Sequence, residues 1–367
     1  MSKIIIHYVD DEVDDETSMG GKRYKERLSQ TGSFECKLIT PPKLDELGRL
    51  VADPPDLFLI DYELSMVQPD GTKAAYQGST LAAEIRTRLP NCPIVLLTRE
   101  SILNRLNRQT RRQLTEHVQQ CDELILKDMI DDKLDETRQL LILLANGFRA
   151  LGGIKRKTWK SLVKILGTDD EEAGFLREAA PPLEKGEWIV TGAANWMRNV
   201  VLEFPGILYD PVNAATRLGI SVEAFHDDRV QDLIESAKYT GVFAPPEGRW
   251  WKGRLFRKAR ELSEENSIDG PINQAFAEAF RKKFGSKLSQ AICVWDHTSI
   301  ADWVCHVLGQ PVKIKNSLRY YPDSRPSVMD NARVSFRAIR ESNTFDEDLL
   351  DSEGSKLLKR IERLPEP

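Results

Sequence analysis

The chain has 367 residues, and its 52 Lys and Arg residues against 57 Asp and Glu residues leave a net charge of −5. Split at residue 148, the first part carries −6 and the second +1, so neither has the strong positive field typical of a nucleic-acid-binding domain. No window approaches the roughly eighteen apolar residues of a membrane span, and the N-terminus lacks a signal-peptide pattern. The five cysteines form no close CxxC pair. We therefore expect reduced thiols and a soluble, cytoplasmic protein of two or three domains.

The first 150 residues alternate apolar strands with amphipathic helices. Four strongly apolar runs predict strands at residues 4–9, 57–60, 94–97 and 124–126. Strands that alternate with helices form βαβ units, which build a parallel sheet with helices on both faces. A leucine-rich stripe predicts a last helix from Asp132 to Leu151, which ends at Gly152 and Gly153. We place the end of the first domain there, at residue 151.

Beyond residue 151 the pattern becomes mainly helical. Predicted helices lie at Lys155–Leu166, Pro211–Gly219, Val222–Ala237, Trp250–Glu265, Pro271–Phe284 and Ser299–Leu308. Two alternating segments, Val312–Lys315 and Arg333–Ile339, predict half-buried strands. Residues 152–342 are therefore predicted to form a mainly helical domain with a few strands. Residues 343–367 are predicted to form a charged tail with one short helix at Lys356–Leu364.

Polar side chains follow the four apolar runs in a fixed order, namely Asp10, Asp11, Asp61, Thr98 and Lys127. Because groups just past the carboxyl ends of parallel strands converge on one crevice, we expect these five side chains to form one site. Three carboxylates that repel one another are a binding site for a hard cation such as Mg²⁺. An aspartate can also attack phosphorus as a nucleophile, and a hydroxyl and an ammonium can bind the oxygens of the transferred group.

This ordered set resembles the receiver domain of bacterial two-component response regulators, over about residues 1–148. The resemblance implies a flavodoxin-like, five-stranded, doubly wound parallel sheet. It also implies that Asp10, Asp11 and Asp61 bind Mg²⁺ together with the backbone carbonyl of Glu63. A histidine kinase would then transfer a phosphoryl group to Asp61, so the resemblance predicts a phosphoprotein in a phosphorelay.

In the same resemblance, Thr98 and Lys127 bind and sense the phosphoryl group, but three neighbouring residues depart from the family pattern. Arg99 follows the threonine, where receivers usually carry a small residue. Leu124 stands where an aromatic residue usually precedes the lysine, and Asp128 replaces the proline that usually follows it. The peptide bond before Asp128 is expected to be trans, because a cis bond before a residue other than proline costs about 3–4 kcal/mol. A degenerate receiver that works without phosphate stays open as an alternative.

The second half contains one segment that resembles a helix-turn-helix. Gly219 would lie in its turn, and Ser221 would cap its second helix. A DNA-binding version needs basic and amide side chains on that helix. Here it offers Glu223, Asp227, Asp228, Asp232 and Glu235 against Arg229. A helical hairpin with common turn chemistry is therefore favoured, and a DNA-binding regulator acting through residues 211–237 is the alternative.

The most basic window, residues 249–260, carries six cations and no acid. It is either a nucleic-acid surface or a helix with one buried and one solvated face. The second half contains no phosphate loop, no zinc-protease motif and no nucleophile elbow. We therefore expect a non-enzymatic output domain that binds a protein target. An unrecognised enzyme with a cleft lined by His226, Asp296 and His297 stays open as an alternative. A homodimer stays open, and a membrane partner is not expected.

Overall fold

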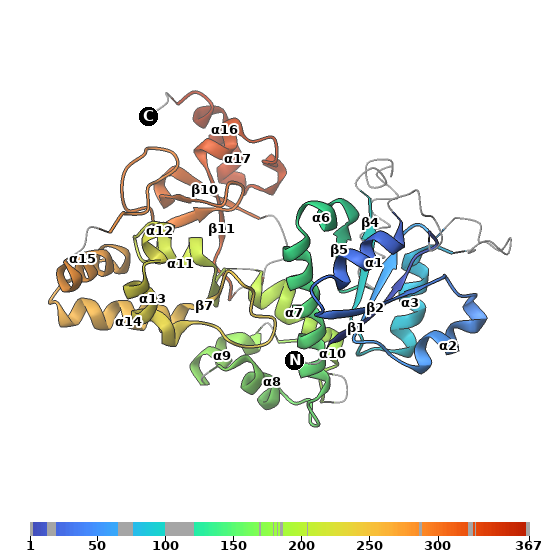
Figure 1. Ribbon diagram of the computed structural model, residues 1–367. Helices are drawn as coiled ribbons and strands as arrows, with labels where there is room; N and C mark the ends of the chain where they lie inside the picture. The colour runs from blue at the N-terminus through green and yellow to red at the C-terminus, as the bar shows by residue number, and fades with distance from the viewer. Residues whose placement is uncertain are drawn as a thin grey trace. The chain divides into compact units, whose positions relative to one another are not determined.

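A computed structural model describes most of the chain. The described residues are 3–12, 20–64, 76–99, 121–168, 170–178, 180–181, 183, 186–203, 205–285, 288–321, 326 and 328–364. They form two compact units (Figure 1). The N-terminal unit comprises Met1–Leu162 with Pro181–Asn195, and the C-terminal unit comprises Val163–Ala180 with Trp196–Pro367.

The N-terminal unit is built on a five-stranded parallel sheet. Its strands are β1 (Ile4–Val9), β2 (Phe34–Ile39), β3 (Leu57–Asp61), β4 (Ile94–Thr98) and β5 (Glu123–Leu126). They lie in the order β2-β1-β3-β4-β5, and each neighbouring pair is parallel. This is the flavodoxin-like order, in which ligands bind beyond the carboxyl ends of the strands. The predicted fold class is confirmed.

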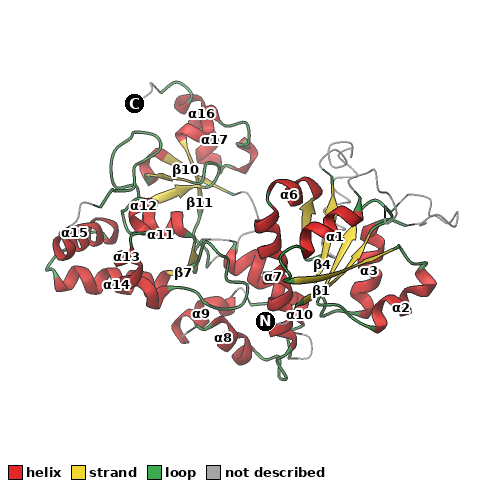
Figure 2. Cartoon of the chain, viewed as in Figure 1, coloured by secondary structure: helices red, strands yellow, loops and turns green. Residues whose placement is uncertain are grey.

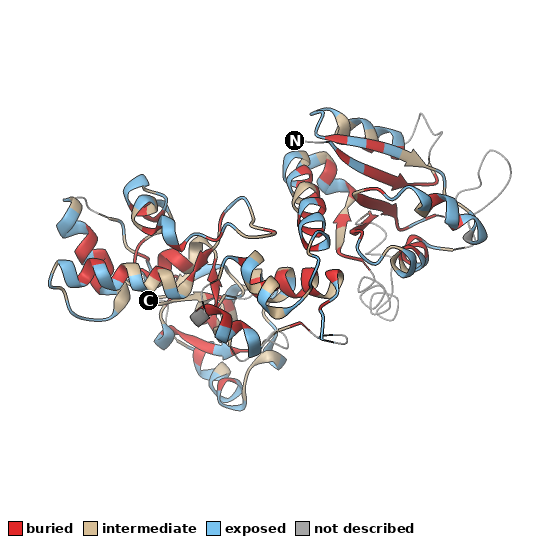
Figure 3. Cartoon of the chain, turned by 90° about the horizontal axis from the view of Figure 1, so that it is seen from below, coloured by how far each residue is buried: buried red, intermediate tan, exposed pale blue. Residues whose placement is uncertain are grey.

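Helices cover both faces of this sheet (Figure 2). They are α1 (Gly21–Ser29), α2 (Leu47–Ala52), α3 (Gly78–Arg88), α6 (Lys127–Asp132) and α7 (Leu134–Gly152). Side chains of α1 and α7 share one apolar core with alternate residues of the strands. Side chains of α2 and α3 share a second core with the residues that point the other way. Because both faces are covered, β3 and β4 are buried at every residue and read as continuous apolar runs (Figure 3).

The rest of the chain is mainly helical, as predicted. Its helices are α8 (Trp159–Leu166), α9 (Asp170–Glu178), α10 (Val190–Trp196), α11 (Pro211–Arg217), α12 (Val222–Phe225), α13 (Asp228–Ile234), α14 (Lys252–Glu265), α15 (Ile272–Phe284), α16 (Phe336–Glu341) and α17 (Ser352–Ile361). The Asp210 carboxylate accepts a hydrogen bond from the backbone N–H of Asn213, so Asp210 caps α11 as its position before Pro211 predicts. The prediction of a single helix over Val222–Ala237 is wrong. The chain leaves the helical path after Phe225, and the carboxylate of Asp227 caps a second helix, α13.

The C-terminal unit also contains two small sheets. The strands β8 (Trp303–Cys305), β9 (Gln310–Val312), β10 (Ser317–Tyr320) and β11 (Ala332–Ser335) lie in the order β10-β11-β8-β9, and β6 (Leu208–Tyr209) pairs with β7 (Trp250–Trp251). The helix predicted at Ser299–Leu308 is therefore wrong. Its central residues form a hairpin in which Trp303 pairs with Val312, because Gly309 turns the chain with a φ of +61°.

The strand predicted at Arg333–Ile339 ends early. Ser335 closes β11, and its hydroxyl accepts a hydrogen bond from the backbone N–H of Ala338, which starts α16. Further along, α17 packs with the core of the four-stranded sheet through Ile361, which is buried. The domain boundaries at residues 151 and 342 stay predictions.

Two features bear on the predicted environment of the protein. All five cysteines are buried and free. None of the helices in the described part of the chain combines the length and the apolarity needed to cross a membrane.

Candidate functional site

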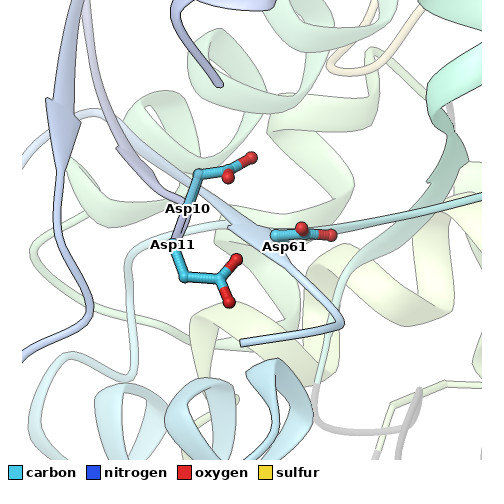
Figure 4. Close-up of side chains that lie close together, drawn as sticks. All are labelled: Asp10, Asp11 and Asp61. Atoms are coloured by element: carbon cyan, nitrogen blue, oxygen red, sulfur yellow. The ribbon is translucent and has the colours of Figure 1, made fainter. Parts of the chain in front are cut away.

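Three aspartates meet at the carboxyl edge of the sheet (Figure 4). Asp10 and Asp11 follow β1, and Asp61 is the last residue of β3, the strand that pairs with β1. Each offers one carboxylate oxygen, and these three oxygens lie within 4.8 Å of one another. The residues are only 0%, 7% and 5% exposed. The convergence expected from the strand ends is therefore observed for all three carboxylates.

Lys127 brings an amino group to this cluster of carboxylates. It is the first residue of α6, directly after β5, and it is 1% exposed. Its Nζ atom lies 2.8 Å from Oδ2 of Asp61 and 3.3 Å from Oδ2 of Asp10. A cation buried between two carboxylates offsets part of the repulsion that assembling three acids creates.

The electrostatics of the site raise the pKa of Asp61 above the ordinary value for an aspartate. Burial raises the pKa of Asp61 to about 7, Lys127 opposes this rise, and the negative charges of Asp10 and Asp11 add to it. Burial alone would lower the pKa of Lys127, but the carboxylates of Asp61 and Asp10 outweigh it and raise that pKa. Lys127 is therefore a permanent cation at neutral pH.

Thr98, the last residue of β4, completes the predicted set. It is 0% exposed, and its hydroxyl has no hydrogen-bond partner among the residues that the structure describes. A buried hydroxyl without a partner is rare in folded proteins, so Thr98 has a donor to offer a bound group at this edge. The predicted set of Asp10, Asp11, Asp61, Thr98 and Lys127 thus lies at one edge of the sheet. The roles of these residues stay predictions.

Sequence reasoning missed Tyr8. This residue lies on β1, is 0% exposed, and donates a hydrogen bond from its hydroxyl to Oδ2 of Asp10. The other oxygen of Asp10, Oδ1, accepts the backbone N–H of Glu12 at 2.8 Å. Alternate residues of a strand share a face, so the spacing of Tyr8 and Asp10 was the signal that could have revealed the contact.

The residues that depart from the family pattern also have defined positions. Nη2 of Arg99 lies 3.2 Å and 3.4 Å from the carboxylate oxygens of Glu12, so an ion pair joins the residues that follow Thr98 and Asp11. Leu124 lies within β5, and the Asp128 side chain is exposed. The peptide bond before Asp128 is trans, as expected. The backbone carbonyl of Glu63 stays a predicted metal ligand.

Gly78 holds the first turn of α3 against the carboxyl end of β3. A Cβ atom on Gly78 would lie 1.9 Å from the backbone oxygen of Asp61, and the Gly78 backbone N–H donates to the carbonyl of Tyr62 at 3.0 Å. Only glycine permits so close an approach of two backbones.

Gly78→Ala is therefore expected to lower the free energy of unfolding of the N-terminal unit by about 1–3 kcal/mol. Hydrogen exchange of the β3 amides measures this change. Gly48→Ala is the matched control, because a Cβ atom at Gly48 in α2 meets no atom within 4 Å. Equal exchange in the two variants would contradict the proposed close contact.

The donor set suits a divalent cation such as Mg²⁺. Hard oxygen ligands from one or two carboxylates, with waters completing the shell, are what Mg²⁺ prefers in proteins. The three buried carboxylates supply those oxygens, and they are the only such cluster among the residues that the structure describes. Lys127 compensates only part of their charge, so the cluster keeps negative charge that a bound cation would offset.

Comparison with known proteins yields matches in structure alone. No family model and no curated protein matches the chain. A receiver domain protein from Clostridium thermocellum is 16% identical, with a TM-score of 0.28, over 40% of this chain and 98% of that one. The response regulator TrrA of Thermotoga maritima, solved in complex with Mg²⁺ and BeF, is 25% identical, with a TM-score of 0.26, over 38% and 98% of the two chains.

A third match is a response regulator of the LuxR family from Aurantimonas, 16% identical with a TM-score of 0.28 over 40% of this chain and 87% of that one. Response regulator receiver domains thus match about 40% of this chain, at its N-terminal end. These three matches do not extend over the C-terminal unit.

Proposed function

We propose that the protein is a response regulator whose N-terminal unit accepts a phosphoryl group on Asp61 from a histidine kinase. One observation carries this proposal. The Lys127 ammonium lies within hydrogen-bond distance of Asp61, inside a buried cluster of three carboxylates at the ligand-binding edge of the sheet. A fold of this type that only needed to be stable would not concentrate three acids there, because buried charge is costly unless it is compensated.

In the proposed reaction, a carboxylate oxygen of Asp61 attacks the phosphorus of a phosphohistidine. An O–P bond forms while the P–N bond breaks, and the imidazole leaves with the bonding electrons and takes up a proton. Mg²⁺ held by Asp10, Asp11 and Asp61 would neutralise charge on the phosphoryl oxygens. Lys127 stabilises the new anion as a point charge, and the Thr98 hydroxyl, buried beside it at the end of β4, gains the hydrogen-bond partner it lacks.

Asp61→Asn tests the proposal, because it keeps the shape of the side chain and removes the nucleophile. We expect the full-length protein to be labelled by radioactive acetyl phosphate in the presence of Mg²⁺, and the variant to lose this label entirely. Asp53→Asn, at an exposed carboxylate of the same unit, is the control and should label normally. Persistent labelling of the Asp61 variant would refute the proposed acceptor.

A degenerate receiver is the second candidate, and one observation favours it. The Arg99–Glu12 ion pair joins the residues that directly follow Thr98 and Asp11, where receivers usually carry a small residue in place of Arg99. Wild-type protein that binds Mg²⁺ but takes no label, and that labels once Arg99 is replaced by Ala, would support this candidate over the first.

For the C-terminal unit we propose a non-catalytic role in which it binds a protein target. The DNA-binding alternative finds little support in the geometry. The helix after the turn, α12, has only four residues, too short to present a recognition surface in a major groove. In the basic window, Arg254 donates to both carboxylate oxygens of Glu172 at 3.0 and 2.8 Å, so it holds α14 to α9. Salt-dependent duplex binding that vanishes when Arg257 is replaced would revive the alternative.

A further inference from the structure

Tyr8 is a buried polar residue at the candidate site, and the proposed phosphoryl transfer gives it no role. It lies on β1, and its hydroxyl donates to Oδ2 of Asp10. In this geometry the hydroxyl is the donor and the Asp10 carboxylate is the acceptor.

Asp10 accepts three hydrogen bonds from described residues. Its Oδ2 atom accepts from the Tyr8 hydroxyl and from Nζ of Lys127, which lies at 3.3 Å. Its Oδ1 atom accepts the Glu12 backbone N–H. Two donors use both lone pairs of Oδ2, so a cation can reach Asp10 only through the remaining lone pair of Oδ1.

We propose that Tyr8 is a positioning residue that weakens Mg²⁺ binding by stabilising the metal-free carboxylate of Asp10. This inference rests on the proposed function, because it concerns the metal site of that reaction. A hydrogen bond to an ionised carboxylate is strongest when the carboxylate carries its full charge. A bound cation draws that charge away, so the Tyr8 contact contributes more to the metal-free form than to the metal-bound form.

Tyr8→Phe tests the inference, because it removes the donor and keeps the ring in the core. Mg²⁺ is titrated into the full-length protein by isothermal calorimetry at pH 8, where Asp61 is mostly ionised. We expect the variant to bind Mg²⁺ about tenfold more tightly than the wild type, which is the change produced by removing about 1.4 kcal/mol of hydrogen-bond stabilisation from the metal-free carboxylate. Amides of β1 in the metal-free variant are expected to exchange faster than in the metal-free wild type, so Mg²⁺ affinity and the stability of the unit change in opposite directions.

Tyr24→Phe is the matched control. Tyr24 is equally buried, and its ring lies 5.8 Å from Nζ of Lys127, yet its hydroxyl makes no hydrogen bond to Asp10 in the structure. Its Mg²⁺ affinity should equal that of the wild type. A second comparison, Tyr8→Phe in an Asp10→Asn background, should leave the affinity unchanged, because the charged acceptor is gone.

Equal or weaker Mg²⁺ binding by Tyr8→Phe would overturn the inference, and weaker binding would make Tyr8 an orienting group instead. These outcomes leave the proposed function intact if the wild type is still labelled on Asp61. If neither protein binds Mg²⁺, the inference and the metal site fail together. If Tyr8→Phe binds more tightly but the wild type takes no label, the inference stands and only the proposed phosphoryl transfer fails.

Discussion

Replacing Lys127 by Met is expected to lower the free energy of unfolding of the N-terminal unit by about 3–5 kcal/mol at pH 8. The side chain is 2% exposed in this unit, and its ammonium contacts Asp61 and Asp10. Met keeps the apolar stem and removes the charge, so two buried carboxylates lose their shared cation. The loss should be smaller at pH 5, because Asp61 then carries a proton and needs no cation.

Hydrogen exchange of amides in β1 and β3 measures this effect in the full-length protein. It isolates the N-terminal unit, whereas a global melt would mix the two units. Lys133→Met is the matched control, since Lys133 forms an exposed pair with Glu136 in which the side chains are 56% and 67% exposed. A surface pair contributes about 0–1 kcal/mol. If both variants lose equally little stability, Lys127 does not hold the cluster together.

The stability of the N-terminal unit should also depend on pH through Asp61. The pKa of this residue is about 7 in the folded protein, against roughly 4 in an unfolded chain. Between these pH values the folded state binds more protons than the unfolded state. The contribution of Asp61 to the free energy of unfolding is therefore complete below about pH 4, and it decreases as the pH rises towards 7. Between pH 5 and pH 8 the free energy of unfolding falls by about 3 kcal/mol.

The measurement compares wild type with Asp61→Asn, which does not titrate. Hydrogen exchange at pH 5 and pH 8 gives the free energy of unfolding of the N-terminal unit in each protein. From pH 5 to pH 8, the wild type should lose about 3 kcal/mol of this free energy relative to the variant. Mg²⁺ should reverse much of this shift at pH 8, because it binds only the ionised carboxylates. A difference that stays constant with pH would show that Asp61 is ionised throughout.

The parallel sheet and the location of its site were predictable from local pattern. Apolar runs of strand length alternate with helical stripes, and parallel strands place their carboxyl ends on one edge. The position of Asp61 after a run of four apolar residues was therefore enough to place it beside Asp10 and Asp11. The prediction failed at Ser299–Leu308, where strand pairing with residues near 311 overrides the local helical pattern.

By itself, the sequence determined which acids, which hydroxyl and which amino group would gather at the edge of the sheet. Only the tertiary structure decided how they bind one another. Lys127 contacts Asp10 although 117 residues separate them in the sequence. The distances from its Nζ atom to the carboxylates of Asp10 and Asp61 depend on how α6 packs against β5. The donation from Tyr8 to Asp10 and the unpartnered hydroxyl of Thr98 depend equally on side-chain packing. Strand periodicity sets which face a residue occupies, but the partner it meets there is set by the neighbouring strand and by the core beneath it.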